Sequence, residues 1–94
     1  MKLEWSEGAQ TDRNAIYDFI DANNPRAAIA VDDRIEEAVE RLVRFPMSGR
    51  IGRVDGTREL VIDRTPYIAA YRIADRKIRV LRLLHGAQEW PDDF

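Results

Sequence analysis

The chain has no cysteine, a single histidine, His85, and no apolar run close to the roughly 20 residues that a membrane helix needs. Without cysteine it can form no disulfide, no iron–sulfur cluster, no thiolate zinc site and no cysteine nucleophile. One histidine excludes a histidine cluster, and the sequence lacks a calcium loop, so we expect no metal and no cofactor. The missing apolar run and signal-peptide pattern predict a cytoplasmic protein without membrane contact.

The charges are divided unevenly along the chain, although 15 lysines and arginines nearly balance 17 aspartates and glutamates. Residues 1–40 carry a net charge of −6, residues 41–82 carry +7 and residues 83–94 carry −3. Such an asymmetry is typical of a surface that binds a charged partner. Charged faces that merely segregate in solvent would give the same pattern.

The first half of the chain predicts a short strand and two amphipathic helices. A strand is expected over 2–5, and a helix over 6–22 with Ser6 as its N-cap. A second helix, from Pro25 to Phe45, follows an asparagine cap and ends before the next proline. The short joint between the helices predicts an antiparallel helical hairpin, whose outer faces carry the acidic excess.

The second half predicts an antiparallel sheet. Residues 46–57, rich in glycine and arginine, read as a loop. Three runs typical of strands follow over 58–63, 67–74 and 77–84, and their short connections predict a three-stranded meander with the last strand central. The chain of 94 residues is therefore expected to form one domain, 1–94.

The predicted fold class is α+β, with the N-terminal strand, the antiparallel helical hairpin and then the three-stranded antiparallel meander, and with the helices packed on one face of the sheet. The inner face would receive mainly apolar side chains, namely Leu60, Ile62, Ile78, Val80 and part of 67–73. The outer face would carry basic side chains, namely Arg58 or Arg72 together with Arg79 and Arg82.

Four sequence pieces follow one another in a distinctive order: GRIGR at 49–53, TRELV at 57–61, YIAAYR at 67–72 and LRLLHGAQEWP at 81–91. With the order of the predicted elements, they resemble the RelE/ParE superfamily of toxins from bacterial type II toxin–antitoxin modules, over nearly the whole chain. The resemblance implies a small toxin neutralised by an antitoxin encoded beside it. The antitoxin's C-terminal segment wraps the toxin and its N-terminal part usually binds operator DNA, so we expect no specific DNA binding by the toxin alone.

Members of the superfamily divide by target. RelE-like toxins enter the ribosomal A site and cut mRNA, whereas ParE-like toxins inhibit DNA gyrase and are not known as nucleases. RelE-like nucleases commonly carry an arginine after the tyrosine that corresponds to Tyr67, and another basic residue near the end of the last strand. Here those places hold Ile68 and, approximately, Gln88, and neither can stabilise a crowded phosphate.

Three functions therefore stay open. ParE-like inhibition of DNA gyrase with growth arrest is the first hypothesis, in which the chain is not an enzyme. RelE-like, ribosome-dependent and metal-independent mRNA cleavage is the second, although the net charge of −2 is unlike a cationic ribosome binder. A non-toxic protein-binding module is the third.

No catalytic residue is assigned, but RNA cleavage would draw on five candidates: His85 as acid or base, Tyr67 for stacking, and Arg58, Arg72 and Arg82 for phosphate. The plainer interpretation makes His85 a structural residue bonded to backbone and Tyr67 a core residue. For gyrase binding the candidates are Arg50, Arg53 and Trp90, whose indole N–H suits an interface. Trp90 could equally pin the tail to the sheet.

The antitoxin is expected to carry an acidic C-terminal segment that binds by a helix in a groove and by β-augmentation at a sheet edge. The hypothesis pairs it with the basic face of the sheet, through Arg58, Arg72, Arg79 and Arg82.

Overall fold

Ser6 and Asn24 begin the two helices of the chain, whose residues 1–94 are all described by the computed structural model. Helix α1 spans Glu7–Asp21, and the Ser6 hydroxyl accepts a hydrogen bond of 3.0 Å from the backbone N–H three residues on. Helix α2 spans Pro25–Arg41, and the Asn24 side chain accepts the corresponding bond. These caps satisfy N–H groups that a helix start leaves without partners, as the sequence predicted.

Helix α2 ends four residues before the expected Phe45. The N–H groups of Leu42, Val43 and Arg44 bond to carbonyl groups three residues back, which tightens the chain out of the α-helical path. Pro46 also disfavours the helical conformation for the residue before it. Phe45 consequently leaves the apolar stripe and is 61% exposed.

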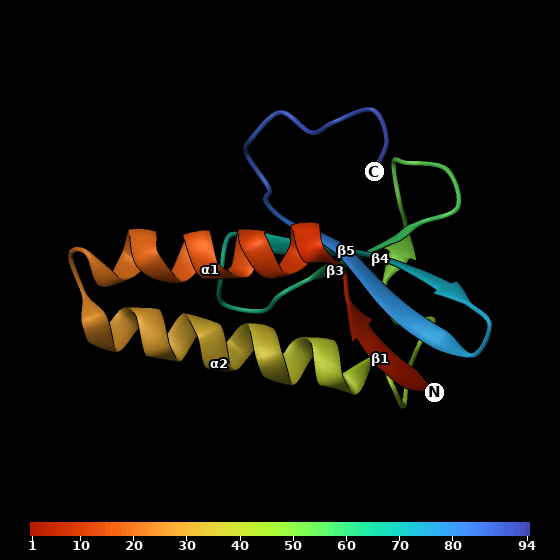
Figure 1. Ribbon diagram of the computed structural model, residues 1–94, viewed down its shortest axis with the longest axis horizontal. Helices are drawn as coiled ribbons and strands as arrows, with labels where there is room; N and C mark the ends of the chain where they lie inside the picture. Colours follow the sequence, from red (N-terminus) through yellow and green to blue (C-terminus); the bar gives the residue numbers. More distant parts are fainter.

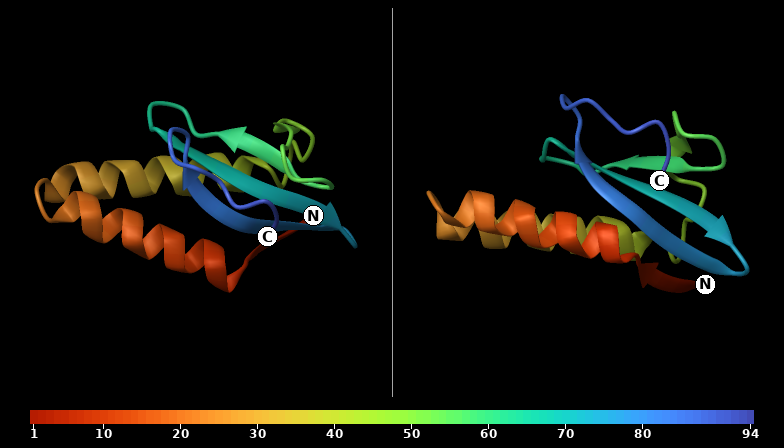
Figure 2. Two further views of the ribbon diagram at one scale, coloured as in Figure 1. Left: turned by 90° about the horizontal axis from the view of Figure 1, so that it is seen from above. Right: turned by 45° about the horizontal axis from the view of Figure 1, so that its top comes forward.

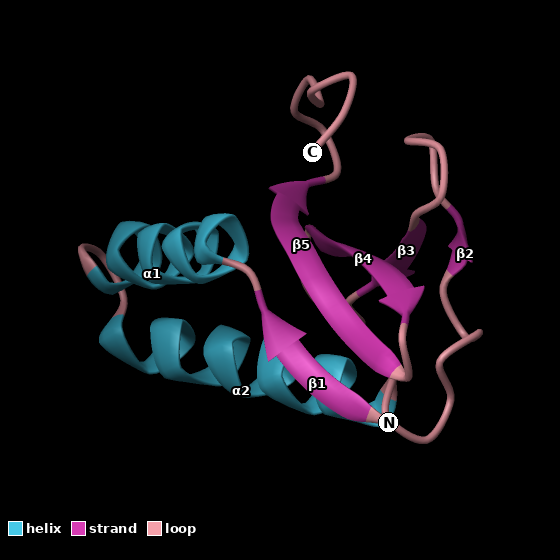
Figure 3. Cartoon of the chain, turned by 45° about the vertical axis from the view of Figure 1, so that its right-hand side comes forward, coloured by secondary structure: helices cyan, strands magenta, loops and turns pink.

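The sheet has the strand order β1-β5-β4-β3-β2 (Figure 3). Strand β1 pairs in parallel with β5, and the other pairs are antiparallel. The strands are β1 Lys2–Trp5, β2 Arg50–Ile51, β3 Arg58–Val61, β4 Tyr67–Ala74 and β5 Lys77–His85. This order confirms the α+β fold with a helical hairpin followed by a meander.

Two details of the sheet differ from the prediction. The stretch expected to be only a loop contains the two-residue strand β2, which pairs with β3 at the edge of the sheet. Strand β5 is interior, between β1 and β4, but the middle strand is β4. The sequence did not distinguish them because β4 and β5 are both largely apolar.

The helical hairpin packs on one face of the sheet, and its turn projects away from the strands (Figure 1). The helices meet the expected inner-face residues Ile62, Ile78 and Val80, which are fully buried. Tyr67 and Tyr71 are buried in the same layer. Neither helix has the length and apolar character needed for a membrane span.

A register shift in β5 brings Val80 and Leu83, three residues apart in the chain, to the same helix-side face. Tyr71 pairs with Val80 while Ala70 pairs with Arg82, so Leu81 is an extra residue in β5. Beyond this bulge Leu83 joins the helix-side core, and Leu84 is buried on the opposite face.

Candidate functional site

The outer face of the sheet, which the helices do not cover, carries a hollow of about 740 Å³. Its floor comes from β1, β4 and β5, and the C-terminal tail passes over it (Figure 2). Four basic and four acidic side chains line the hollow, so its charge is mixed rather than uniformly basic.

Arg72 and Arg79 are cross-strand neighbours on this face. Both side chains are engaged within the chain: Arg79 forms an ion pair with Glu4 of β1, and Arg72 donates a hydrogen bond of 3.3 Å to the carbonyl oxygen of Gly56. Arg72 is exposed and has no ion-pair partner. Among the predicted antitoxin contacts on this face, Arg72 is the one without an ion pair, since Arg79 and Arg82 both have one.

Arg82 turns from this face toward helix α1, against the expectation of a free basic side chain. It donates two hydrogen bonds, of 2.7 and 3.1 Å, to the carboxylate of Asp12. The same carboxylate accepts the N–H of Leu83 at 2.9 Å. Strand β1 ends beside Val80, so Asp12 takes the place of the missing strand along β5. Its hydrogen bond raises the pKa of Arg82.

Arg58 lies on the helix-side face, opposite Tyr71, so Arg72 and not Arg58 occupies the outer face. Its guanidinium donates to the carbonyl oxygen of Gly49 at 2.8 Å. The Tyr71 hydroxyl accepts the N–H of Gly49 at 3.0 Å and donates to the carbonyl oxygen of Pro46 at 2.7 Å. Arg58 and Tyr71 together fix the chain between α2 and β2.

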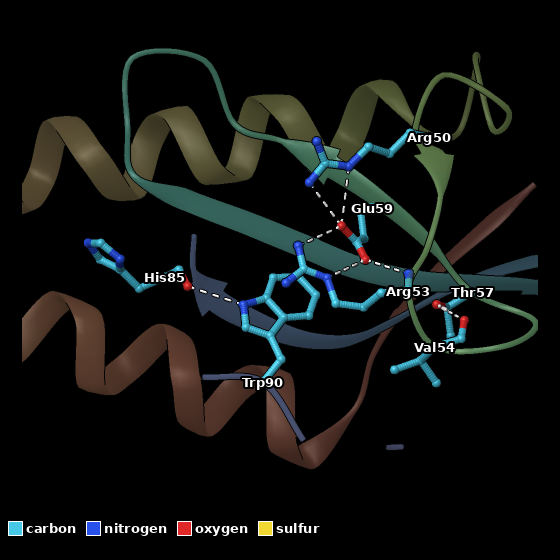
Figure 4. A network of polar contacts seen from close by, with 7 residues as sticks. All are labelled: Arg50, Arg53, Val54, Thr57, Glu59, His85 and Trp90. Carbon is cyan, nitrogen blue, oxygen red and sulfur yellow. Dashed lines mark hydrogen bonds and ion pairs between the residues drawn. The ribbon is translucent and has the colours of Figure 1, made fainter. Parts of the chain in front are cut away.

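Glu59 holds the glycine- and arginine-rich segment of residues 46–57, which we call the arginine loop (Figure 4). Its side chain is 3% exposed, although it is a charged residue in a small protein. Arg50 donates to one carboxylate oxygen at 3.0 Å, and Arg53 contributes its backbone N–H at 2.8 Å and its guanidinium at 3.1 and 3.2 Å. Burial acts to raise the pKa of Glu59, but the hydrogen bonds from Arg53 and Arg50 outweigh it, and the pKa is lowered.

Trp90 stacks on the same cluster. The Arg53 guanidinium carbon lies 3.6 Å from the centre of the Trp90 ring, and the indole N–H donates to the carbonyl oxygen of His85 at 3.2 Å (Figure 4). The three residues predicted for target binding, Arg50, Arg53 and Trp90, therefore lie together around one buried carboxylate. This contact connects the tail to the loop before β3.

His85 has the local contacts of a structural residue. Its Nδ1 accepts the N–H of Ala87 at 3.0 Å, and its backbone N–H donates to the side chain of Gln88 at 2.7 Å. Its ring meets Tyr67 edge-on, with 5.7 Å between the centroids. Burial raises the pKa of the Tyr67 phenol, which therefore stays protonated and packs in the core.

The five nuclease candidates do not converge. His85 and Tyr67 meet at one end of the β4–β5 pair, on the helix-side face. Arg72 lies five residues along β4 from Tyr67, roughly 17 Å at about 3.4 Å per residue, and on the opposite face. Arg58 and Arg82 hold backbone and carboxylate groups elsewhere. No three His, Asp or Glu side chains of the chain are placed to hold a metal ion.

Three residues that organise the site, Glu59, Asp12 and Tyr71, were not among the candidates predicted from the sequence. The sequence contained one indication of the role of Glu59, because this single acid in a predicted strand closely follows two arginines of the loop. Asp12 carried none, since its partners lie 70 and 71 residues away. Tyr71 lies within residues 67–73, part of which the sequence predicts to face the core, and its hydroxyl additionally anchors the loop.

Comparison with known proteins identifies the family. The family model described as the ParE toxin of the type II toxin–antitoxin system, parDE, matches residues 3–90. The chain belongs to this ParE toxin family. It is therefore a toxin of the RelE/ParE superfamily, as the sequence resemblance indicated.

Relatives of this ParE-family toxin carry both superfamily names. The chain is 40% identical to the protein Y4kP of Sinorhizobium fredii, over 96% of this chain and 93% of that protein. It is 33% identical to toxin RelE2 of Caulobacter vibrioides, over 93% of this chain and 97% of that toxin. A chain in the structure of the chromosomal ParDE TA system from P. aeruginosa is 33% identical, with a TM-score of 0.82 over 90% of this chain and 95% of that one.

Proposed function

We propose that this ParE-family toxin arrests growth by binding and inhibiting DNA gyrase, without cleaving RNA. The observation that carries the proposal is the scatter of the nuclease candidates over two faces of the sheet. Metal-independent RNA cleavage needs an acid, a base and a cation around one phosphate. Here the histidine is hydrogen-bonded within a turn of the C-terminal tail, and Arg58, Arg72 and Arg82 lie at separate places on the sheet.

Two further observations support gyrase over the ribosome. The family model that matches residues 3–90, nearly the whole chain, is that of ParE toxins. The hollow of the outer face has equal numbers of basic and acidic side chains, whereas RNA binding gains affinity with each cation that neutralises a phosphate. We place the toxin in the cytoplasm, where gyrase acts.

Neutralisation by a cognate antitoxin is part of the proposal. The similarity to a chain of the ParDE TA system from P. aeruginosa supports such a partner. The outer face offers Arg72, which is exposed and free of ion pairs, and Arg79, which shares Glu4 with Lys77. An acidic segment of the antitoxin entering this hollow would pair with these cations.

RelE-like mRNA cleavage is the second candidate function. It is favoured by the 33% identity to toxin RelE2, which spans nearly the whole of both chains.

One experiment separates the candidates. Purified toxin is added to a gyrase supercoiling assay and, in parallel, to a translating ribosome system in which mRNA cleavage is mapped. Loss of supercoiling with intact mRNA is the expected result. Codon-dependent cleavage with normal supercoiling would overturn the proposal in favour of the second candidate.

Induced expression in cells provides the matching test of toxicity. Growth arrest that is relieved by the neighbouring reading frame is expected. Normal growth at confirmed soluble expression would instead identify a non-toxic protein-binding module.

A further inference from the structure

The sheet edge at β2 carries an apolar surface that lies apart from Arg72 and Arg79, the antitoxin contacts proposed on the outer face. Met47 and Ile51 are 64% and 82% exposed, and Phe45, two residues before Met47 in the chain, is 61% exposed. Met47, Ile51 and Ile73 line a hollow of about 390 Å³ together with Arg58. We call this region, residues 44–51 with Arg58 and Ile73, the edge surface. Exposed apolar groups gathered in this way mark protein interaction sites.

The edge surface lies on the helix-side face, where the helices do not reach. Ile51 pairs with Arg58, and Arg58 pairs with Tyr71, so these side chains share a face with the core. Helix α2 has already ended at Arg41, and the chain that follows lies beside the sheet (Figure 3). The outer hollow, with Arg72 and Arg79, lies on the opposite face.

The backbone of β2 has an unpaired side. Strand β2 is the last strand of the sheet, and only β3 pairs with it. Gly52 donates its N–H to the carbonyl oxygen of Thr57. Because hydrogen-bonding directions alternate along an antiparallel strand, the backbone groups of Ile51 point outward. An extended segment of a partner can add to this edge.

The charge of the region selects the kind of segment. Residues 41–59 contain five arginines, one aspartate and one glutamate, a net charge of +3, although Glu59 is paired with Arg50 and Arg53. Arg41 and Arg44 are exposed and form no hydrogen bond or ion pair through their side chains, unlike Arg72, Arg79 and Arg82. A second copy of the chain would bring the same charges against each other, whereas an acidic segment is complementary.

The edge surface is held in place before any partner binds. The Tyr71 hydroxyl fixes the backbone at Pro46 and Gly49, and Arg58 holds the carbonyl oxygen of Gly49. A rigid surface loses little conformational entropy on binding. This arrangement distinguishes residues 46–51 from an ordinary flexible loop.

From the open edge, the exposed apolar side chains and the free arginines, we propose that the edge surface is where the toxin contacts its target. The target supplies an extended acidic segment that adds to β2 and places a bulky apolar side chain in the hollow between Met47, Ile51 and Ile73. This inference rests on the proposed function, in which the target is DNA gyrase, and adds a contact site that is separate from the outer face.

The test uses the full chain with Met47 and Ile51 both changed to Asp. Both side chains are largely exposed, so the fold is expected to remain, as checked by circular dichroism and thermal unfolding. We expect a loss of at least tenfold in the inhibition of purified gyrase and the loss of growth arrest. Phe19→Asp is the matched control, because Phe19 is 74% exposed near the hairpin turn, and should inhibit like the wild type.

A second pair of variants tests the charge. Arg44→Glu should weaken inhibition, and Arg26→Glu, an exposed arginine at the start of α2, should not. Amide hydrogen exchange of the complex with gyrase should slow in residues 45–52 and stay unchanged in the hairpin turn. Protection confined to another region would overturn the assignment.

The two proposals fail in different ways. A wild-type toxin that arrests growth but leaves gyrase active would refute the target, while the growth assay of the double variant would still decide the surface. A double variant that arrests growth like the wild type would refute the edge surface. If only antitoxin binding is lost and toxicity remains, the surface belongs to the antitoxin and the inference is wrong. A wild-type chain without toxicity would refute both.

Discussion

At the scale of single residues, the buried carboxylate of Glu59 determines how the arginine loop and the tail meet. It fixes Arg53, and Arg53 supports the ring of Trp90. Glu59 is buried, whereas its partners Arg50 and Arg53 are about half exposed. Breaking the network would therefore mainly penalise the buried carboxylate, which would lose its hydrogen bonds without gaining water. Exposed arginines can be hydrated when the acid is removed, so the loss should be moderate.

Replacing Glu59 by Gln should lower the free energy of unfolding by about 1–3 kcal/mol at neutral pH. The folded pKa of Glu59 is lowered, so its contribution is present above the unfolded pKa of about 4.3 and is lost as the pH falls through the folded pKa. The free energy of unfolding, measured with urea, should therefore decrease less steeply between pH 7 and pH 3 for E59Q than for the wild type. Parallel pH profiles would contradict this role.

Gly49 is required by a close approach rather than by an unusual backbone angle. A Cβ atom added there would lie 2.6 Å from the Tyr71 hydroxyl and 3.0 Å from the carbonyl oxygen of Glu59. Gly49→Ala should cost about 1–3 kcal/mol of stability through this overpacking. Gly86→Ala is the control, because its added Cβ would meet nothing closer than 3.5 Å. Thermal unfolding of both variants provides the measurement, and equal melting temperatures would contradict the argument.

At the scale of elements, the sequence predicted the features that depend on neighbouring residues, such as helix starts. It did not predict those that depend on a distant partner strand. Both helix starts follow from Ser6 and Asn24, whose capping bonds reach only three residues. The alternation of β4 and β5 predicted the inner face as far as Val80. The extra residue Leu81 could not be predicted, because a bulge is defined by the partner strand and leaves no local pattern.

The sequence offered three residues as candidates for target binding, but it did not show their contacts with one another. The sequence selected Arg50, Arg53 and Trp90, which do lie together. It could not show that Glu59 would neutralise both arginines, since each contact depends on how β2 and the tail cross the sheet. Short strands such as β2 carry too few residues for an alternation to be recognised.

Asp12 of helix α1 accepts hydrogen bonds along the edge of β5 that β1 leaves unpaired. Replacing Asp12 should therefore reduce stability more than replacing another acidic residue of the same helix. Asp12→Ala removes the acceptor of both Arg82 and the N–H of Leu83, and should cost about 1–3 kcal/mol. Asp18→Ala, an exposed residue of the same helix with no side-chain partner, should be close to neutral. Urea denaturation of the two variants gives the comparison, and a similar loss for both would refute the edge-closing role.

At the scale of the whole molecule, the net charge of −2 is the sum of an acidic segment, residues 1–40, a basic segment, residues 41–82, and an acidic tail. Charged residues of the first two segments also pair with one another inside the molecule. The hairpin uses part of its acidic excess internally, since Arg13 of α1 pairs with Asp32 and Glu36 of α2. Asp12 and Glu4 neutralise Arg82 and Arg79 of the sheet. The charge that remains for partners is therefore smaller than the sequence count suggests. On the sheet and its β2 edge it includes Arg72, Arg44 and Arg58, which form no ion pair.

This distribution predicts which arginine on the outer face controls capture of the antitoxin. Arg72→Glu reverses an exposed charge that holds only one hydrogen bond, to Gly56, so the fold should be retained. The association rate with the antitoxin encoded beside the toxin should fall about tenfold at low salt, and the difference from the wild type should shrink as salt screens the charges. Surface plasmon resonance at several ionic strengths measures both effects, with Arg26→Glu at the hairpin turn as the matched control. An association rate that falls equally for the two variants would mean that the antitoxin senses net charge, and that the outer face is not its docking surface.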